Sequence, residues 1–213
     1  MSFYRTIYKI FSAPVSWVYR LRVVGVENIP QNGCILASNH TAFSDVLILS
    51  AAARRQVRYM AKKELFKIPL LSQLITALGA YPVNRGGADV SSIKRTIHML
   101  EEGELIGIFP QGHRYGGVDP RTTSVKGGVG MIAYHTHADV IPAYVDSKRG
   151  KTGMFRRNTV IFGKPIPYSE LGFVNGGVKE YQRAAEIVFQ KVCALKYGEA
   201  AAASTETTAE DEA

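Results

Sequence analysis

Short apolar runs alternate along the chain with segments in which apolar residues recur every three or four positions. The runs predict buried strands, and the helical spacing predicts helices. We expect strands at 21–26, 34–38, 57–61, 80–83, 105–109, 139–145 and 159–163, and helices at 45–53, 70–78, 90–103, 125–135 and 178–197. Alternation of this kind favours the α/β class. We therefore predict a single layered domain with a mixed, mostly parallel sheet flanked by helices.

An amphipathic segment precedes this domain. Aromatic and aliphatic residues recur there at helical spacing, namely Phe3, Tyr4, Ile7, Tyr8 and Phe11. Residues 12–14 end in Pro14, which predicts a break before a second helical segment that carries Trp17. Basic residues surround both parts, a pattern that suits the interface of an anionic membrane, although a helix packed on its own core would show it too. We divide the chain into amphipathic helices at 1–22, a domain at 23–197 and a disordered acidic tail at 198–213.

The charge of the chain points to an anionic partner. The formal net charge is +8, but five of the 18 acidic residues lie after residue 198. Residues 1–198 hold 26 basic and 13 acidic residues, a net charge of +13. No basic helix, zinc-finger spacing or aromatic RNA-binding pattern is present, so we expect phospholipid surfaces or phosphorylated substrates and no nucleic acid.

The remaining composition bounds the location of the protein. The two cysteines have no framework spacing, which favours a reduced, intracellular chain with both thiols in the core. The run at 68–84 is interrupted by Pro69, Gln73, Gly79 and Pro82, so we expect no transmembrane span. Lys9 interrupts the first apolar run, and we expect no cleaved signal.

His40 and Asp45 follow an expected strand and are five residues apart. A neutral imidazole can take a proton at physiological pH, and a carboxylate can fix its tautomer and stabilise the imidazolium. The two side chains can meet only if His40 precedes the next helix, whose N-cap would be Thr41 or Ser44. A capped turn with no catalytic role fits these eight residues equally well.

Three further blocks stand at or near the ends of expected strands, where open α/β sheets bind ligands. The second block runs from 59 to 65 and from 79 to 85, and it brings in Lys62 and Arg85. The third, Phe109-Pro110-Gln111-Gly112-His113-Arg114, combines an arginine with a glycine that permits close backbone approach. The fourth is the apolar run Val140-Ile141-Pro142. Arg85 and Arg114 have the planar fork that holds a phosphate bidentately.

In order and spacing, the four blocks resemble the motifs of the glycerolipid acyltransferases, from about residue 23 to about residue 168. Asn39-His40-x4-Asp45 is similar to the first motif, Gly79-x-Tyr81-x3-Arg85 to the second, the 109–114 block to the third and Val140-Ile141-Pro142 to the fourth. The resemblance implies transfer of a fatty acyl group from acyl-CoA or acyl-carrier protein to the free sn-2 hydroxyl of lysophosphatidate. No cofactor is implied. The resemblance also implies a peripheral or monotopic protein on the cytoplasmic face of the cell membrane.

The resemblance assigns roles to individual residues. His40 is implied as the base and Asp45 as its orienting carboxylate; Arg114, Arg85 and Lys62 are implied as acceptor-phosphate ligands. Gln111 and Gly112 are implied as acceptor-binding, and Phe43, Leu65 and Phe66 are candidates for a groove that receives acyl chains. The chain departs from the third motif at two positions, with Gln111 in place of the usual glutamate and His113 in place of threonine or serine. The identity of the acceptor therefore stays open between lysophosphatidate, glycerol-3-phosphate and a lyso-aminolipid.

Other readings of the sequence are less favourable. His135, His137 and Asp139 lie at a helix end without further ligands, so no metal is expected. Ser44 lacks a nucleophile elbow, and the glycines at 127–130 lack the lysine of a phosphate loop. A silent lipid-binding protein is the alternative of another class.

Overall fold

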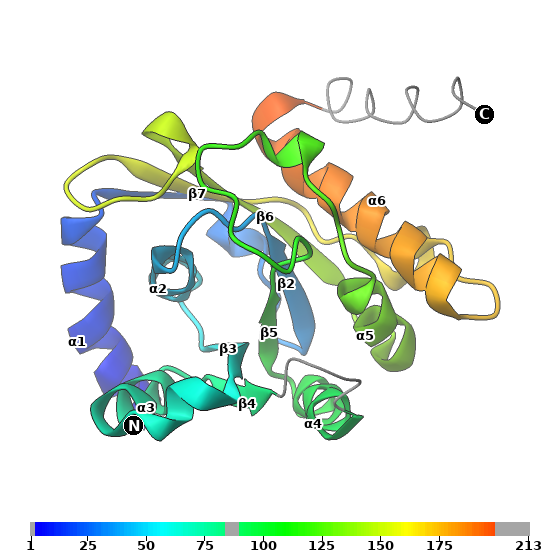
Figure 1. Ribbon diagram of the computed structural model, residues 1–213, viewed down its shortest axis with the longest axis horizontal. Helices are drawn as coiled ribbons and strands as arrows, with labels where there is room; N and C mark the ends of the chain where they lie inside the picture. The colour runs from blue at the N-terminus through cyan, green and yellow to red at the C-terminus, as the bar shows by residue number, and fades with distance from the viewer. Residues whose placement is uncertain (1–2, 84–89, 199–213) are drawn as a thin grey trace.

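Seven strands form one twisted sheet that is covered by helices on both faces (Figure 1). The computed structural model describes residues 3–83 and 90–198. The strands are β1 (Leu21–Val24), β2 (Cys34–Ser38), β3 (Val57–Lys62), β4 (Tyr81–Val83), β5 (Leu105–Ile108), β6 (Val140–Ser147) and β7 (Asn158–Phe162). The helices are α1 (Phe3–Val18), α2 (Ser44–Ala52), α3 (Pro69–Ala77), α4 (Val90–Glu101), α5 (Gly128–Thr136) and α6 (Val178–Tyr197). The predicted α/β class is confirmed.

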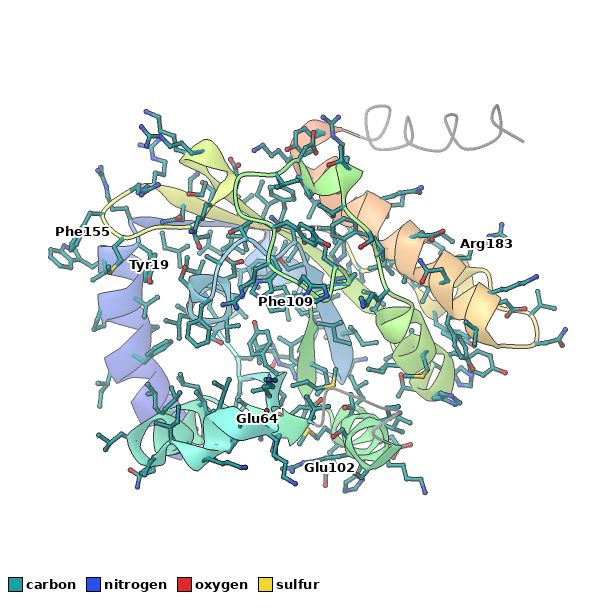
Figure 2. The ribbon with its side chains drawn as sticks, in the orientation of Figure 1. Tyr19, Glu64, Glu102, Phe109, Phe155 and Arg183 are labelled. Atoms are coloured by element: carbon teal, nitrogen blue, oxygen red, sulfur yellow. The ribbon has the colours of Figure 1, made fainter. Side chains whose placement is uncertain are left out.

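The sheet is mixed and mostly parallel, as predicted. Its order is β1-β7-β6-β2-β5-β3-β4. The five strands from β6 to β4 are mutually parallel, whereas β7 runs antiparallel to β6 and pairs in parallel with β1. The carboxyl ends of β2, β5 and β3 therefore lie along one edge. Phe109, directly after β5, lies near the middle of the molecule (Figure 2).

Alternate residues of the buried strands pack into two hydrophobic cores, one on each face of the sheet. In β2, Ile35 and Ala37 pack with α4, α5 and α6, whereas Cys34 and Leu36 pack with α2 on the opposite face. A strand that is covered on both faces has to be apolar throughout, which explains the continuous apolar runs in the sequence. Cys34 and Cys193 are free and buried, and burial raises their thiol pKa values to about 11 and about 12.

The predicted break at 12–14 is wrong. The helix α1 continues from Phe3 to Val18 with Pro14 inside it, and it packs against α2. Proline removes one backbone donor, but contact with α2 stabilises the helix beyond that position. The predicted domain limit at residue 22 falls inside β1, which is part of the sheet.

The described boundaries otherwise differ from the prediction by a few residues at the ends of elements. Gly25, at φ +74°, ends β1 and starts a short 3-10 turn at Val26–Asn28. A 3-10 helix at Lys63–Lys67, which the sequence did not predict, connects β3 to α3. The tail from residue 199 and Arg85 lie outside the described residues.

Candidate active site

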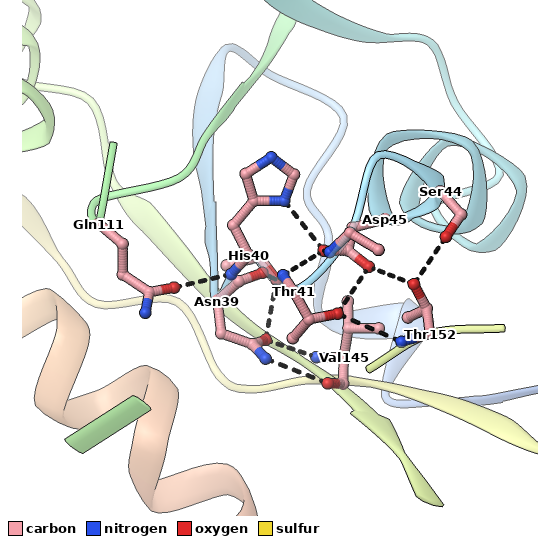
Figure 3. A network of polar contacts seen from close by, with 10 residues as sticks. Asn39, His40, Thr41, Ser44, Asp45, Gln111, Val145 and Thr152 are labelled. Carbon is pink, nitrogen blue, oxygen red and sulfur yellow. Dashed lines mark hydrogen bonds and ion pairs between the residues drawn. The ribbon is translucent and has the colours of Figure 1, made fainter. Parts of the chain in front are cut away.

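The pair predicted from the sequence is formed at the carboxyl end of β2. His40 Nδ1 lies 2.9 Å from Asp45 Oδ2 (Figure 3). Asp45 is completely buried, whereas 15% of the His40 side chain is exposed. His40 precedes α2 and Asp45 is in its first turn, which is the arrangement that five-residue spacing requires. The exposed partner is the imidazole, the group that has to reach a substrate.

Asp45 accepts hydrogen bonds from the turn that precedes its own helix. Oδ2 accepts the backbone N–H groups of Thr41 at 2.5 Å and Ala42 at 2.8 Å. The N-cap position is Phe43, with no side-chain cap, so the expected cap by Thr41 or Ser44 is wrong. The carboxylate itself satisfies the free donors near the helix start, where its negative charge is favourable.

Thr152 completes the environment of Asp45. Its hydroxyl donates to Asp45 Oδ1 at 2.8 Å, and the Thr41 hydroxyl donates to the same oxygen at 3.1 Å. Ser44 contacts the Thr152 hydroxyl at 2.6 Å, a structural position that agrees with its rejection as a nucleophile. Thr152 was missed in the sequence because it lies 107 residues from Asp45 in a loop without a strand signal.

The His40 ring is held in one orientation. It stacks on Phe109 with ring centroids 3.9 Å apart, and Phe109 stacks in turn on Tyr59. Because the carboxylate of Asp45 also accepts from Thr41, Ala42 and Thr152, Nδ1 carries the proton and donates to it. Nε2 is then the unprotonated nitrogen, and it faces away from Asp45 (Figure 3). The pair can therefore accept a proton at Nε2.

The backbone of His40 is fixed from both sides. Its N–H donates to Gln111 Oε1 at 2.8 Å, and its carbonyl accepts from the Tyr115 N–H at 2.8 Å. The side chain of the preceding residue, Asn39, exchanges two hydrogen bonds with the backbone of Val145 in β6, at 2.8 and 3.1 Å. The first and third sequence blocks and the strand β6, which begins with the fourth block, thus meet around one residue.

Gln111 and Gly112 differ in exposure. Gln111 is 1% exposed, and its amide also donates to Thr123 Oγ1 at 2.7 Å. Gly112 is exposed with φ +68°, and an added Cβ would lie 3.1 Å from the Lys126 side chain. Gln111 therefore holds the backbone of His40, a role that the sequence did not predict, and its proposed contact with an acceptor stays a prediction.

The predicted phosphate ligands lie in two neighbouring parts of the same edge. Arg114 is exposed in the loop after β5. Lys62 ends β3, the neighbour of β5, and among the described residues its ion pair is a long contact with Glu64 at 3.9 Å, in which both side chains are more than half exposed. These two cations are free to meet an anionic ligand. Arg85 lies outside the described residues.

The acyl-groove candidates are partly accessible. Phe43 is 51% exposed directly before α2, and Leu65 and Phe66 are half-buried in the 3-10 helix after β3. A cavity of about 30 Å³ is lined by residues that include His40, Gln111 and Tyr144. That volume suits one or two water molecules and not an acyl chain. The acyl groove at Phe43, Leu65 and Phe66 stays a prediction.

The other candidate clusters have structural roles. His135 lies against Tyr134 and Tyr181, whereas His137 ends α5 at φ +52° and contacts Tyr168. In the described ranges, 3–83 and 90–198, no three histidine, cysteine or acidic side chains gather as a metal site. Gly130 packs against the Tyr181 backbone, where an added Cβ would lie 2.1 Å from the carbonyl oxygen.

Comparisons with known proteins converge on one family. A model of the acyltransferase family matches residues 20–146. The 1-acyl-sn-glycerol-3-phosphate acyltransferase of Bacillus subtilis is 33% identical over 150 residues, which cover 68% of this chain and 73% of that protein. The enzyme of the same name from Streptococcus pneumoniae is 28% identical over 172 residues, which cover 78% of this chain and 62% of that protein.

A solved structure has the same fold. It is the 1-acyl-sn-glycerophosphate acyltransferase PlsC from Thermotoga maritima, with a TM-score of 0.69 and 24% identity. The match covers 91% of this chain and 79% of that chain.

The environment of Asp45 predicts a difference in stability between two substitutions. Asp45→Ala leaves buried donors without a partner and should lower the free energy of unfolding by roughly 2–4 kcal/mol. His40→Ala removes a partly exposed ring and should cost only about 1 kcal/mol. Urea denaturation of the two variants measures this difference. Equal losses would show that the carboxylate does not organise the site.

Proposed function

This chain belongs to the acyltransferase family, and from that premise we propose that it transfers a fatty acyl group from a thioester to the sn-2 hydroxyl of lysophosphatidate. The product is phosphatidate. The observation that carries the proposal is the His40–Asp45 pair, with Nε2 directed away from the carboxylate at the edge where Arg114 and Lys62 also lie. The names of the relatives from Bacillus subtilis and Streptococcus pneumoniae support the choice of acceptor.

The geometry suits direct attack by the acceptor. His40 Nε2 takes the proton of the acceptor hydroxyl as its oxygen bonds to the thioester carbonyl carbon. The tetrahedral intermediate then collapses, the carbon–sulfur bond breaks, and the imidazolium returns the proton to the leaving thiolate. Asp45 stabilises the imidazolium between these two transfers and keeps Nδ1 protonated. No side chain becomes acylated, and no cofactor takes part in these steps.

The acyl donor in this proposal is acyl-CoA or acyl-carrier protein, both of which present the same thioester. The protein works at the membrane in this scheme, since both the acceptor and the product are lipids, and we place it on the cytoplasmic face because both acyl donors are cytoplasmic molecules. In the part of the chain that the structure covers, no helix is long and apolar enough to cross a bilayer. Association through α1 fits this, because Ile10 and Trp17 are 70% and 74% exposed and seven residues apart on one face.

Removal of the base is the first test. His40→Ala should lower the rate of acyl transfer to lysophosphatidate by about 10² to 10⁴-fold. His98→Ala, on α4 with a 69% exposed side chain, is the matched control and should retain full activity. Labelled acyl donor is offered as acyl-CoA or acyl-carrier protein, with lysophosphatidate, glycerol-3-phosphate or a lyso-aminolipid as acceptor. Equal activity of wild type and His40→Ala refutes the base assignment. Inactivity of both with every acceptor points to the silent lipid-binding alternative.

Arg114 tests recognition of the phosphate. Arg114→Ala should raise the KM for lysophosphatidate by about tenfold or more, because a charge-assisted contact is lost. The KM for a monoacylglycerol, which has no phosphate, should stay unchanged. The control is Arg183→Ala, an exposed arginine on α6 at the right of the molecule (Figure 2). An unchanged KM for the phosphorylated acceptor would exclude Arg114 as a ligand.

Gln111 separates two roles through its kinetics. Because both ends of its amide bond to the protein, Gln111→Ala should lower kcat by about tenfold, with little change in KM. Gln111→Glu keeps an acceptor for the His40 N–H and should recover part of kcat. An increase in KM alone would instead establish the acceptor-binding role implied by the family resemblance.

A further inference from the structure

The loop between β6 and β7 is strongly basic and has an apolar centre. Residues 148–157 read KRGKTGMFRR, with five basic residues and no acidic one. All five basic residues are exposed. Met154 and Phe155 lie between them and are 59% and 65% exposed. Large apolar side chains that face solvent in the middle of a basic segment need a partner other than the core.

This basic loop, defined as residues 148–157, is joined to the end of α1. The Phe155 N–H donates to the Val18 carbonyl at 2.6 Å. The buried side chain of Asn158 donates to the Tyr19 carbonyl at 2.6 Å. The rings of Phe155 and Trp17 meet edge to face, with centroids 6.2 Å apart. Figure 1 shows the loop, in yellow-green, beside the C-terminal end of α1, and Figure 2 shows Phe155 at the outer edge of the molecule.

Phe155 points outward from an unfavourable backbone conformation. Its φ is +57°, in the left-handed region that bulky residues rarely adopt. The hydrogen bond to Val18 holds this conformation, so the exposed ring is a fixed feature of the fold. Trp17, Arg20 and Phe155 line an open recess of about 430 Å³. Aromatic rings around a cation form a surface that is apolar and positively charged together.

We propose that the basic loop is a second membrane-binding element, which contacts an anionic phospholipid surface together with α1. Aromatic and methionine side chains enter the headgroup boundary, and the surrounding cations meet lipid phosphates. An acidic protein partner would bind the basic residues but would not account for the exposed side chains of Met154, Phe155 and Trp17. An anionic bilayer accounts for both the basic residues and the exposed apolar side chains. The proposal extends the membrane association of the proposed function, but its binding test requires no enzymatic activity.

The same loop reaches the catalytic pair. Thr152 is 6% exposed and donates to Asp45, and it lies three residues from Phe155. The Ser147 hydroxyl donates to the Lys151 carbonyl, and Gly117 of the loop after β5 donates to the Gly150 carbonyl. Contact of the loop with lipid is therefore connected, through a few fixed residues, to the carboxylate that orients His40. Thr152 acts here as a positioning residue.

Sedimentation with vesicles tests the surface directly. The full chain is mixed with vesicles of equal parts phosphatidylcholine and phosphatidylglycerol, or of phosphatidylcholine alone. The double variant Met154→Ser/Phe155→Asn should bind the anionic vesicles about tenfold more weakly. Asparagine is chosen because it tolerates a left-handed backbone. Arg156→Gln/Arg157→Gln and Trp17→Ala should weaken binding similarly, and the charge variant should have little effect on neutral vesicles.

Matched controls lie on α6, away from the loop. Val178→Ser removes an apolar side chain that is 83% exposed, and Lys179→Gln/Arg183→Gln removes two exposed cations. Both controls should bind as wild type. Unchanged vesicle binding by the loop variants overturns the proposal, as does an equal loss in the α6 controls. Retained vesicle binding combined with lost binding of acyl-carrier protein would assign the loop to a protein partner and overturn it too.

Activity then tests the connection to Asp45. Thr152→Val should bind vesicles as wild type but show a kcat about tenfold lower with an unchanged KM, and Thr152→Ser should restore it. A change in KM alone, or no rescue by serine, would overturn the positioning role. If the wild type transfers no acyl group to any acceptor, the proposed function fails, whereas sedimentation still decides the membrane surface.

Discussion

A carboxylate without access to water holds the active edge together. Burying the charge of Asp45 costs several kcal/mol, and that cost is offset only where its oxygens are fully hydrogen-bonded. The donors come from the end of β2, from the turn before α2 and from the loop after β6. Displacing any of these segments leaves part of a buried charge unsolvated. The pair is thus the point where a strand, a helix and a distant loop are fixed relative to one another.

The sequence predicted the parts of the fold that depend on local pattern. Buried strands such as β2 and β5 are covered on both faces and appear as uninterrupted apolar runs. The long helix α6 was predicted with its observed bounds, because its apolar face repeats over five turns. Pro14 was misread because the tertiary contact of α1 with α2 outweighs one missing hydrogen bond. Strand order could not be read, since pairing depends on contacts between distant segments.

The same distinction applies to the site. His40 and Asp45 could be found because a five-residue separation and a strand end are local features. Gln111 was predicted as an acceptor-binding residue, but its contact with the His40 backbone, 71 residues away in the sequence, depends on how the loop after β5 lies against the end of β2. Thr152 has no local signature at all. Its role arises only because antiparallel pairing of β6 and β7 returns the chain toward α2.

The Asn39 amide has a consequence beyond the site. Its oxygen accepts from the Val145 N–H and its nitrogen donates to the Val145 carbonyl, so one side chain satisfies both backbone groups of that residue. The side chain therefore continues the β2–β6 pairing for one position after β2 has ended. His40, the next residue, is held by this strand register as well as by its backbone contacts with Gln111 and Tyr115. Exposed positions of the 148–157 loop, such as Arg156 and Arg157, can accordingly diverge in sequence while Thr152 and the base keep their places.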